Sequence, residues 1–304
     1  MKLTNPNIRW PRLLRLSLFA LLALALVLNF GLALAYVYAL THPPCAAPPA
    51  LAEGLPAPLI DEILTEDGVR LEVWYYPSHN GAAVVAMGGM TGSLGAQPPQ
   101  VEALLQAGYG VLQVAGRACG DPPSPVTLGY SESFDAQAAL DYLLDRDDVD
   151  PEKIGIFGFS MGGAAAIQAA ARDDGFAAVI AEGGYFNLGQ DMVEGDGTGP
   201  SQWWLLPFQY TVAWMYRLQT GVDPWLSSPV DVIAEISPRP LLLIYGENEL
   251  ASGRGQLQFE AAREPKELWV VSGGGHGTNH LAAGEEYGRR VAAFFEAALL
   301  DKGE

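Results

Sequence analysis

Residues 154–172 read IGIFGFSMGGAAAIQAAAR and decide the fold, because an apolar run changes within one residue into an alanine-rich stretch. The first part predicts a buried strand and the second a helix. Gly158 and Gly162 flank Ser160, each two positions away. A sharp strand-to-helix turn needs glycine at those positions, because a side chain there would collide with neighbouring elements, and it presents the serine hydroxyl in a strained conformation. We therefore predict Ser160 as a nucleophile.

A serine hydroxyl is a poor nucleophile unless a base accepts its proton, so this prediction requires a histidine further along the chain. Two histidines, His276 and His280, follow the last predicted strand. His276 lies in the glycine-rich loop 273–277, where a side chain can reach back to the turn that carries Ser160. We favour His276 as the base and interpret His280 as a surface or helix-start residue.

The histidine must be held in one tautomer by a carboxylate. After the apolar strand predicted at 240–245, the chain continues Gly246-Glu247-Asn248-Glu249. From position alone, either glutamate could serve as the acid of a catalytic triad.

Acyl transfer also needs backbone N–H groups directed at the developing oxyanion. The residue after the nucleophile, Met161, supplies one such group. The second is expected from the loop after the strand that ends at Met87, which reads GGMTG over residues 88–92. Gly89 and Met90 are the candidates in that loop.

Strands and helices alternate around the Ser160 turn. Apolar runs predict strands at 60–65, 70–76, 82–87, 110–115, 154–159, 177–181, 240–245 and 267–271, and helices at 99–106, 132–146 and 161–172. A closing helix carries the apolar stripe Tyr287, Val291, Phe294, Phe295 and Ala298. This alternation predicts the α/β class, with a mainly parallel eight-stranded sheet flanked by helices.

The strand rhythm is interrupted at about residues 185–230. This stretch contains QWWLLPFQYTVAWMYRLQ at 202–219, which predicts a small helical cap above the sheet. The aromatic side chains of the cap either line an acyl pocket or only pack the cap on the domain: Trp203, Trp204, Phe208 and Trp214.

The amino-terminal region predicts a membrane anchor. Residues 16–40 contain no charge and are long enough to cross a bilayer. The basic residues Lys2, Arg9, Arg12 and Arg15 precede them, so we expect residues 1–15 in the cytoplasm and the domain on the other side of a cell membrane. Residues 41–58 are rich in Pro and Ala and predict a linker. The alternative is a secreted protein with a signal peptide cleaved after Ala33-Leu34-Ala35.

Composition narrows the possible partners. The chain of 304 residues has 17 basic and 35 acidic residues, and a net charge of −18 argues against a nucleic-acid partner. Its two cysteines, Cys45 and Cys119, are too few for a disulfide framework or a paired-cysteine zinc site, and either a single disulfide or two free thiols is possible. Phosphate-loop and metal-ligand motifs are missing from the sequence, so we expect no cofactor and no metal.

The glycine-rich loop, the Ser160 turn, the acid and the histidine, in that order, resemble the α/β-hydrolase superfamily over residues 59–302. The resemblance implies an α/β-hydrolase fold for residues 59–304. It places the acid at Glu249, three residues after the glycine that follows the strand, and the second oxyanion donor at Gly89. Residues 128–163 are similar to the bacterial relatives of dienelactone hydrolases and to membrane-tethered serine hydrolases.

The chain departs from these relatives at three positions. Glu249 stands where aspartate is usual, and Met87 where a histidine is frequent. Ser160 replaces the cysteine nucleophile of dienelactone hydrolases, which favours esterase or peptidase-like chemistry. We therefore expect a serine hydrolase that cleaves an ester, thioester or amide through an acyl-enzyme on Ser160.

A carboxylesterase or lipase-like activity on a small or lipid-like acyl substrate is favoured. The alternatives are a peptidase-like hydrolase and a non-catalytic binding protein on the hydrolase fold. The sequence predicts nothing about the oligomeric state.

Overall fold

The computed structural model describes residues 10–45, 51–90, 98–195, 203–250 and 252–301. Parts of several predicted segments therefore lie outside the described residues: most of the basic segment 1–15, residues 46–50 of the linker, Thr91 and Gly92 of the oxyanion loop, residues 196–202 of the cap, and residues 302–304 at the end of the predicted hydrolase domain.

In the described part of the chain, one sheet has the strand order β1-β2-β4-β3-β5-β6-β7-β8. β1 pairs antiparallel with β2 and β2 antiparallel with β4, and all other pairs are parallel, which confirms the predicted sheet. The bounds are β1 Leu59–Leu64, β2 Arg70–Tyr76, β3 Ala83–Met87, β4 Gly110–Val114, β5 Ile154–Phe159, β6 Ala178–Glu182, β7 Leu241–Gly246 and β8 Lys266–Val271.

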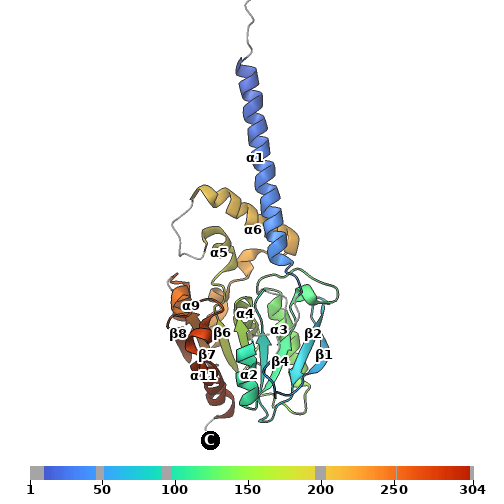
Figure 1. The fold of residues 1–304 in the computed structure, drawn as a ribbon, viewed down its shortest axis with the longest axis vertical. Helices are drawn as coiled ribbons and strands as arrows, with labels where there is room; N and C mark the ends of the chain where they lie inside the picture. Colours follow the sequence, from blue (N-terminus) through green and yellow to red (C-terminus); the bar gives the residue numbers. More distant parts are fainter. Residues whose placement is uncertain (1–9, 46–50, 91–97, 196–202, 251, 302–304) are drawn as a thin grey trace, which may run out of the picture.

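Helices cover both faces of the sheet (Figure 1). On one face α3 (Glu132–Leu144) and α4 (Met161–Arg172) bury their apolar sides, with α9 (Arg254–Ala261) at the edge. On the other face lie α2 (Pro98–Gln106) and α11 (Glu285–Phe295), which continues into a π-helical turn at Glu296–Leu300. Tyr287, Val291 and Phe295 of the predicted closing stripe are buried, whereas Phe294 and Ala298 are only partly buried. The sheet is thus enclosed between two apolar cores.

The segment between β6 and β7 is helical, as predicted, and follows the carboxyl end of β6. It comprises α5 (Leu188–Glu194), η2 (Trp203–Leu205), α6 (Leu206–Thr220), η3 (Pro224–Leu226), α7 (Pro229–Val232) and η4 (Ile233–Ile236). The remaining short helices are η1 (Arg117–Cys119), α8 (Glu247–Leu250) and α10 (Asn279–Ala283).

The amino-terminal helix α1 (Trp10–Thr41) projects from the domain beside α6 (Figure 1). Its stretch from Arg12 to Thr41 is long and apolar enough to cross a membrane, and only 6% of its most apolar window is buried. The helix begins before the predicted start at residue 16, so Arg12 and Arg15 belong to its first turns.

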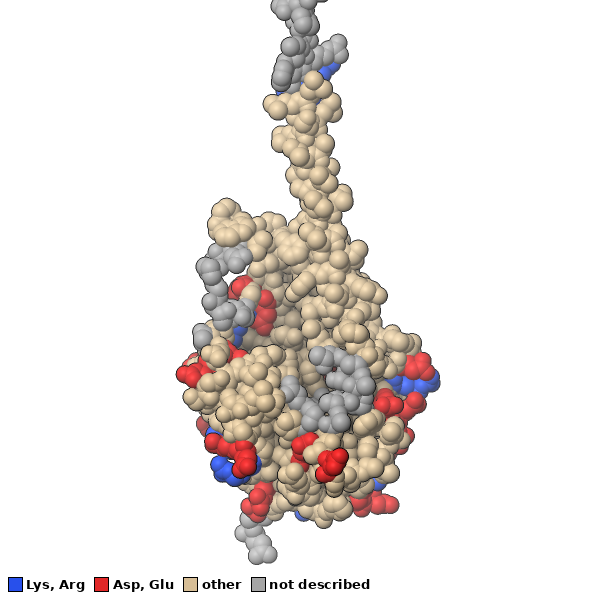
Figure 2. Space-filling model, in the orientation of Figure 1, with Lys and Arg blue, Asp and Glu red and all other residues tan. Residues whose placement is uncertain are grey.

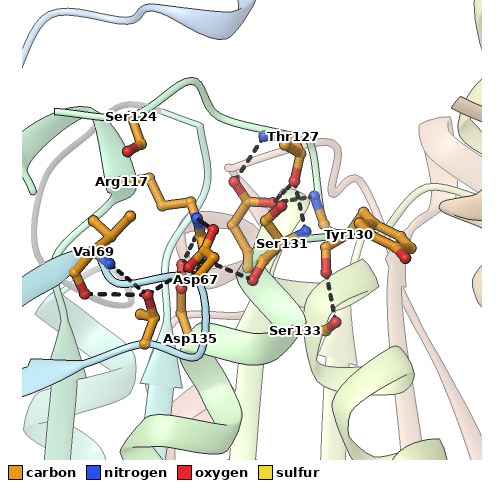
Figure 3. Close-up of polar contacts among 12 residues, drawn as sticks. Asp67, Val69, Arg117, Ser124, Thr127, Tyr130, Ser131, Ser133 and Asp135 are labelled. Atoms are coloured by element: carbon orange, nitrogen blue, oxygen red, sulfur yellow. Dashed lines mark hydrogen bonds and ion pairs between the residues drawn. The ribbon is translucent and has the colours of Figure 1, made fainter. Parts of the chain in front are cut away.

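A disulfide joins Cys45, just after α1, to Cys119 in η1, with 5.2 Å between the two Cα atoms. The possibility of two free thiols is thereby excluded for this fold. The η1 loop is in turn held by the buried guanidinium of Arg117, which lies 2.6 Å from carboxylate oxygens of both Asp67 and Asp135 (Figure 3). Because Val126 also donates its N–H to the carbonyl oxygen of Thr41 at 2.7 Å, the end of α1 is fixed to the domain.

Candidate active site

The turn at Ser160 has the strained geometry that the sequence predicts. Ser160 has φ 55° and ψ −118°, a backbone conformation that residues other than glycine rarely adopt. A Cβ atom on Gly158 would lie 2.0 Å from the carbonyl oxygen of Gly162, and a Cβ on Gly162 would lie 2.4 Å from that of Met87. Both positions therefore require glycine. The turn places the Ser160 hydroxyl at the carboxyl ends of the parallel strands.

Three predicted residues from three different loops come together here. Oγ of Ser160 lies 2.9 Å from Nε2 of His276, and Nδ1 of His276 lies 2.8 Å from Oε1 of Glu249. The other carboxylate oxygen of Glu249 accepts the N–H of Gly246 at 2.8 Å. The ring of Phe159 stacks on the imidazole, with 5.2 Å between centroids. The hydrogen bond to Glu249 and the stacking on Phe159 together orient the imidazole ring of His276.

The rejected candidates lie elsewhere. Glu247 accepts the N–H of Gly273 at 2.9 Å and the hydroxyl of Ser272 at 3.4 Å, on the outside of the loop. The ring of His280 packs edge-on against Tyr287. The geometry therefore favours Glu249 over Glu247, and His276 over His280, for a hydrogen-bonded chain that ends at Ser160.

His276 and Glu249 each shift the pKa of the other toward the charged form. The hydrogen bond to Glu249 raises the pKa of His276 above its ordinary value, because the carboxylate stabilises the imidazolium. Burial opposes ionisation of Glu249, but hydrogen bonds from His276 and from the Gly246 amide outweigh it, and the pKa of Glu249 is lowered. Glu249 is thus held as a carboxylate that can orient an imidazole and stabilise its protonated form.

The two predicted oxyanion donors flank the serine. A Cβ atom on Gly89 would lie 3.4 Å from Cβ of Ser160, so the backbone of this loop passes directly beside the nucleophile. Met161 follows Ser160 at the first position of α4. Within the described ranges, no hydrogen bond from the N–H group of Gly89 or Met161 is present.

Sequence reasoning missed a buried acidic residue behind the site. Glu182, the last residue of β6, is 1% exposed, and its carboxylate accepts hydrogen bonds from the Tyr287 hydroxyl and, at 2.9 Å, from Asn279. Burial raises the pKa of Glu182. Its backbone carbonyl also accepts the Ser160 N–H at 2.7 Å. The available signal was a glutamate directly after an apolar strand, at the edge where the other site residues lie.

A cavity of about 340 Å³ adjoins the imidazole. Its lining includes Gly183, Tyr185, Phe186, Tyr245, Arg254 and His276. None of the four cap aromatics proposed for an acyl pocket belongs to the described lining. Trp203, Trp204 and Trp214 are instead 71%, 61% and 51% exposed, and the ring of Trp214 meets Phe30 of α1. Only Phe208 packs, partly buried, on the apolar cluster under α6.

This sheet, with a strained serine turn at its centre and a histidine and an acid in the following loops, defines an α/β-hydrolase. Residues 127–302, more than half of the chain, match the model of the prolyl oligopeptidase family, and the chain belongs to that family.

Several known proteins resemble the chain over most of its length. YfhR of Escherichia coli K12 is 28% identical over 229 residues, which cover 71% of this chain and 72% of YfhR. The α/β-hydrolase domain-containing protein WAV2 of Arabidopsis thaliana is 28% identical, covering 78% of each chain. The solved structure of the Pyrococcus furiosus esterase Pf2001 superposes with a TM-score of 0.63 at 25% identity, covering 86% of this chain and 98% of the esterase.

Proposed function

We propose that the protein is a serine hydrolase that forms an acyl-enzyme on Ser160, with a carboxylic ester as the favoured substrate. The observation that carries the proposal is the continuous hydrogen-bonded chain from Ser160 through His276 to Glu249. This is the arrangement that serine hydrolases on unrelated folds use to activate a hydroxyl group.

The geometry supports a two-step reaction. Nε2 of His276 takes the proton from Ser160 while Oγ attacks the acyl carbon, and the N–H groups of Gly89 and Met161 donate to the oxyanion. The imidazolium then gives its proton to the leaving oxygen, the carbon–oxygen bond breaks, and the acyl group remains on Ser160. A water molecule, deprotonated by His276, attacks the acyl carbon. The bond between this carbon and Oγ of Ser160 then breaks, the imidazolium returns its proton to Oγ, and the carboxylic acid leaves.

Ester cleavage is favoured over amide cleavage by the likeness to the Pf2001 esterase, which covers 86% of this chain and 98% of the esterase. Peptidase-like cleavage is the second candidate, because the chain belongs to the prolyl oligopeptidase family. A comparison of matched ester and amide substrates distinguishes the two.

We also propose that α1 anchors the domain to a cell membrane, with the domain outside the cytoplasm. The Cys45–Cys119 disulfide supports an oxidising compartment. Retention of α1 is supported by Ala33 and Val37, which are fully buried against the domain. Cleavage after Ala35 would remove Ala33 from this contact, which favours an anchor over a signal peptide.

Labelling with a fluorophosphonate probe tests the proposed chemistry. We expect the full chain in detergent to be labelled, and Ser160→Ala and His276→Ala to lose the label while keeping the circular dichroism spectrum of the wild type. His280→Ala is the matched control and should be labelled normally. A folded wild type that is not labelled would contradict the proposal and favour a binding protein on the hydrolase fold.

A further inference from the structure

The outer side of α6 carries an apolar stripe that the described chain covers only in part. Leu206, Tyr210, Trp214 and Leu218 follow one another at intervals of four residues and are 38%, 56%, 51% and 59% exposed. Residues four apart lie on the same side of a helix. A neighbouring side of α6 is already buried through Val212, Ala213 and Tyr216. The helix is therefore apolar on two sides, and this α6 stripe faces outward.

The α6 stripe is continuous with the surface of α1. The ring of Trp214 meets the ring of Phe30 edge-on, with 6.0 Å between centroids. Asn29 donates a hydrogen bond of 2.8 Å to the hydroxyl of Thr211, so two polar side chains satisfy each other inside an apolar contact. Gln219 reaches the carbonyl oxygen of Leu34 at 3.2 Å. α6 thus lies against the stretch of α1 from Asn29 to Leu34.

The length of α1 fixes the depth of this contact. A hydrocarbon core of about 30 Å needs about 20 helical residues. If the span begins after Arg15, it extends to about residue 35. A span that ended before Asn29 would be only about 20 Å long at about 1.5 Å per residue. Phe30, and with it Trp214, therefore lies about 8 Å inside the outer boundary of the hydrocarbon, which is the depth of an interfacial helix.

We infer that α6 is a second membrane element, which lies in the outer leaflet of the bilayer with the α6 stripe among the acyl chains. The inference rests on the proposed anchor and not on the proposed chemistry. Other exposed apolar side chains come shortly before and after α6 in the chain: Trp203, Trp204, Trp225 and Leu226. Tryptophan and tyrosine are enriched at membrane interfaces, where one end of the ring is apolar and the other is hydrated.

The distribution of charge agrees with this orientation. In Figure 2 the visible surface immediately around the base of α1 shows no Lys, Arg, Asp or Glu, an acidic patch lies lower on the cap side, and most charged side chains gather farther from α1. The one charged residue of α6, Arg217, is paired with Asp223 at 3.2 Å. The charged part of the domain would then face water, and the α6 stripe would face lipid.

Contact of α6 with the bilayer would also position the candidate active site relative to the membrane. Ser160 and His276 lie at the carboxyl ends of the parallel strands, and the chain leaves β6 at this edge to form α5 and α6. A cap seated in the outer leaflet would hold this edge of the domain at the bilayer surface. An acyl chain could then reach the site without crossing bulk water.

Quenching of tryptophan fluorescence by brominated lipid tests the inference. The full chain, with Trp10→Phe to remove the tryptophan at the start of α1, is placed in phosphatidylcholine bilayers with and without bromine on the acyl chains near the headgroup. We expect strong quenching that falls when Trp214→Phe or Trp203→Phe is added. The matched control Trp74→Phe removes a tryptophan of β2, far along the sheet from α6, and should raise the quenched fraction.

Alkaline carbonate extraction of the same samples separates the two proposals. A chain that stays in the membrane but shows no quenching would overturn the position of α6 and leave the anchor standing. A chain that is released by carbonate would overturn both. Quenching that Trp214→Phe does not reduce, together with a cross-linked dimer through α6, would mean that a second copy covers the stripe, and would also overturn the inference.

Discussion

The carboxylate of Glu249 lies 2.8 Å from Nδ1 of His276, although 27 positions separate the two residues in the chain. Glu247 is only two residues away from Glu249 and bonds instead to the Gly273 amide. A change at Glu247 is therefore a matched control for a change at Glu249. One change removes the acid of the proposed triad, and the other removes a neighbouring carboxylate of the same loop.

Replacing the acid should impair chemistry and not binding. Glu249→Gln keeps the shape of the side chain but favours the wrong imidazole tautomer, so we expect kcat for a soluble ester to fall about 10³- to 10⁴-fold with little change in KM. Glu247→Gln should alter kcat by less than about threefold, since a surface change of this kind has small effects. An equal loss of kcat in both variants would contradict a specific role for Glu249 and would show that either change simply disturbs the structure of the loop.

The pH dependence should follow the ionisation of His276. Only the neutral imidazole accepts the Ser160 proton, so kcat/KM should rise with pH through the pKa of His276 in the free enzyme. Because Glu249 raises this pKa, the acidic limb should lie above the ordinary histidine value of 6.5. In Glu249→Gln the limb should move to lower pH. A limb that stays in place in this variant would contradict the assigned pair.

The disulfide should contribute to stability without touching the site. Cys45 and Cys119 enclose 74 positions of sequence, and closing a loop of that size stabilises a fold by about 4 kcal/mol in the chain-entropy description. We expect the double variant Cys45→Ser with Cys119→Ser to lose about this much free energy of unfolding in urea. Addition of dithiothreitol to the wild type should reproduce the loss, and a shift below about 1 kcal/mol would show that the bridge is not formed.

The cap should influence substrates according to where they reside. If the α6 stripe lies in lipid, Tyr210→Gln with Leu218→Gln should lower the ratio of bilayer-embedded long-chain ester cleavage to soluble short-chain ester cleavage about tenfold. The matched pair Gln256→Ala with Glu260→Ala changes the exposed side of α9 and should leave that ratio unchanged. If the stripe variant has the same ratio as the wild type, the α6 stripe does not help the enzyme to reach esters in the bilayer.

Much of the fold could be predicted from sequence because apolar periodicity directly reports burial. The strand β5 and the helix α4 coincide with their predicted bounds, since a continuous apolar strand changes to an alanine-rich helix at a single residue. The acid and the histidine could be proposed because their loops follow predictable strands. Chain order and strand ends then limit the choice to a few side chains.

Other features depend on contacts that no local pattern carries. Glu182 looks like an ordinary strand end, and its side-chain hydrogen bonds come from α2, about 80 residues earlier, and from α10 and α11, about 100 residues further along the chain. The exposed tryptophans of the cap look like core or pocket residues, because apolar periodicity does not distinguish side chains buried in the protein from apolar side chains left on its surface. Pairing of the cysteines required the position of η1 relative to the end of α1.

The most direct test of the central claim is the turnover of a p-nitrophenyl ester together with mass analysis of the quenched enzyme. We predict a burst of about one nitrophenol per chain, an acyl group on the peptide that contains Ser160, and loss of both in a folded Ser160→Ala variant. Undiminished turnover in Ser160→Ala, or an acyl group found only on another residue, would contradict the account.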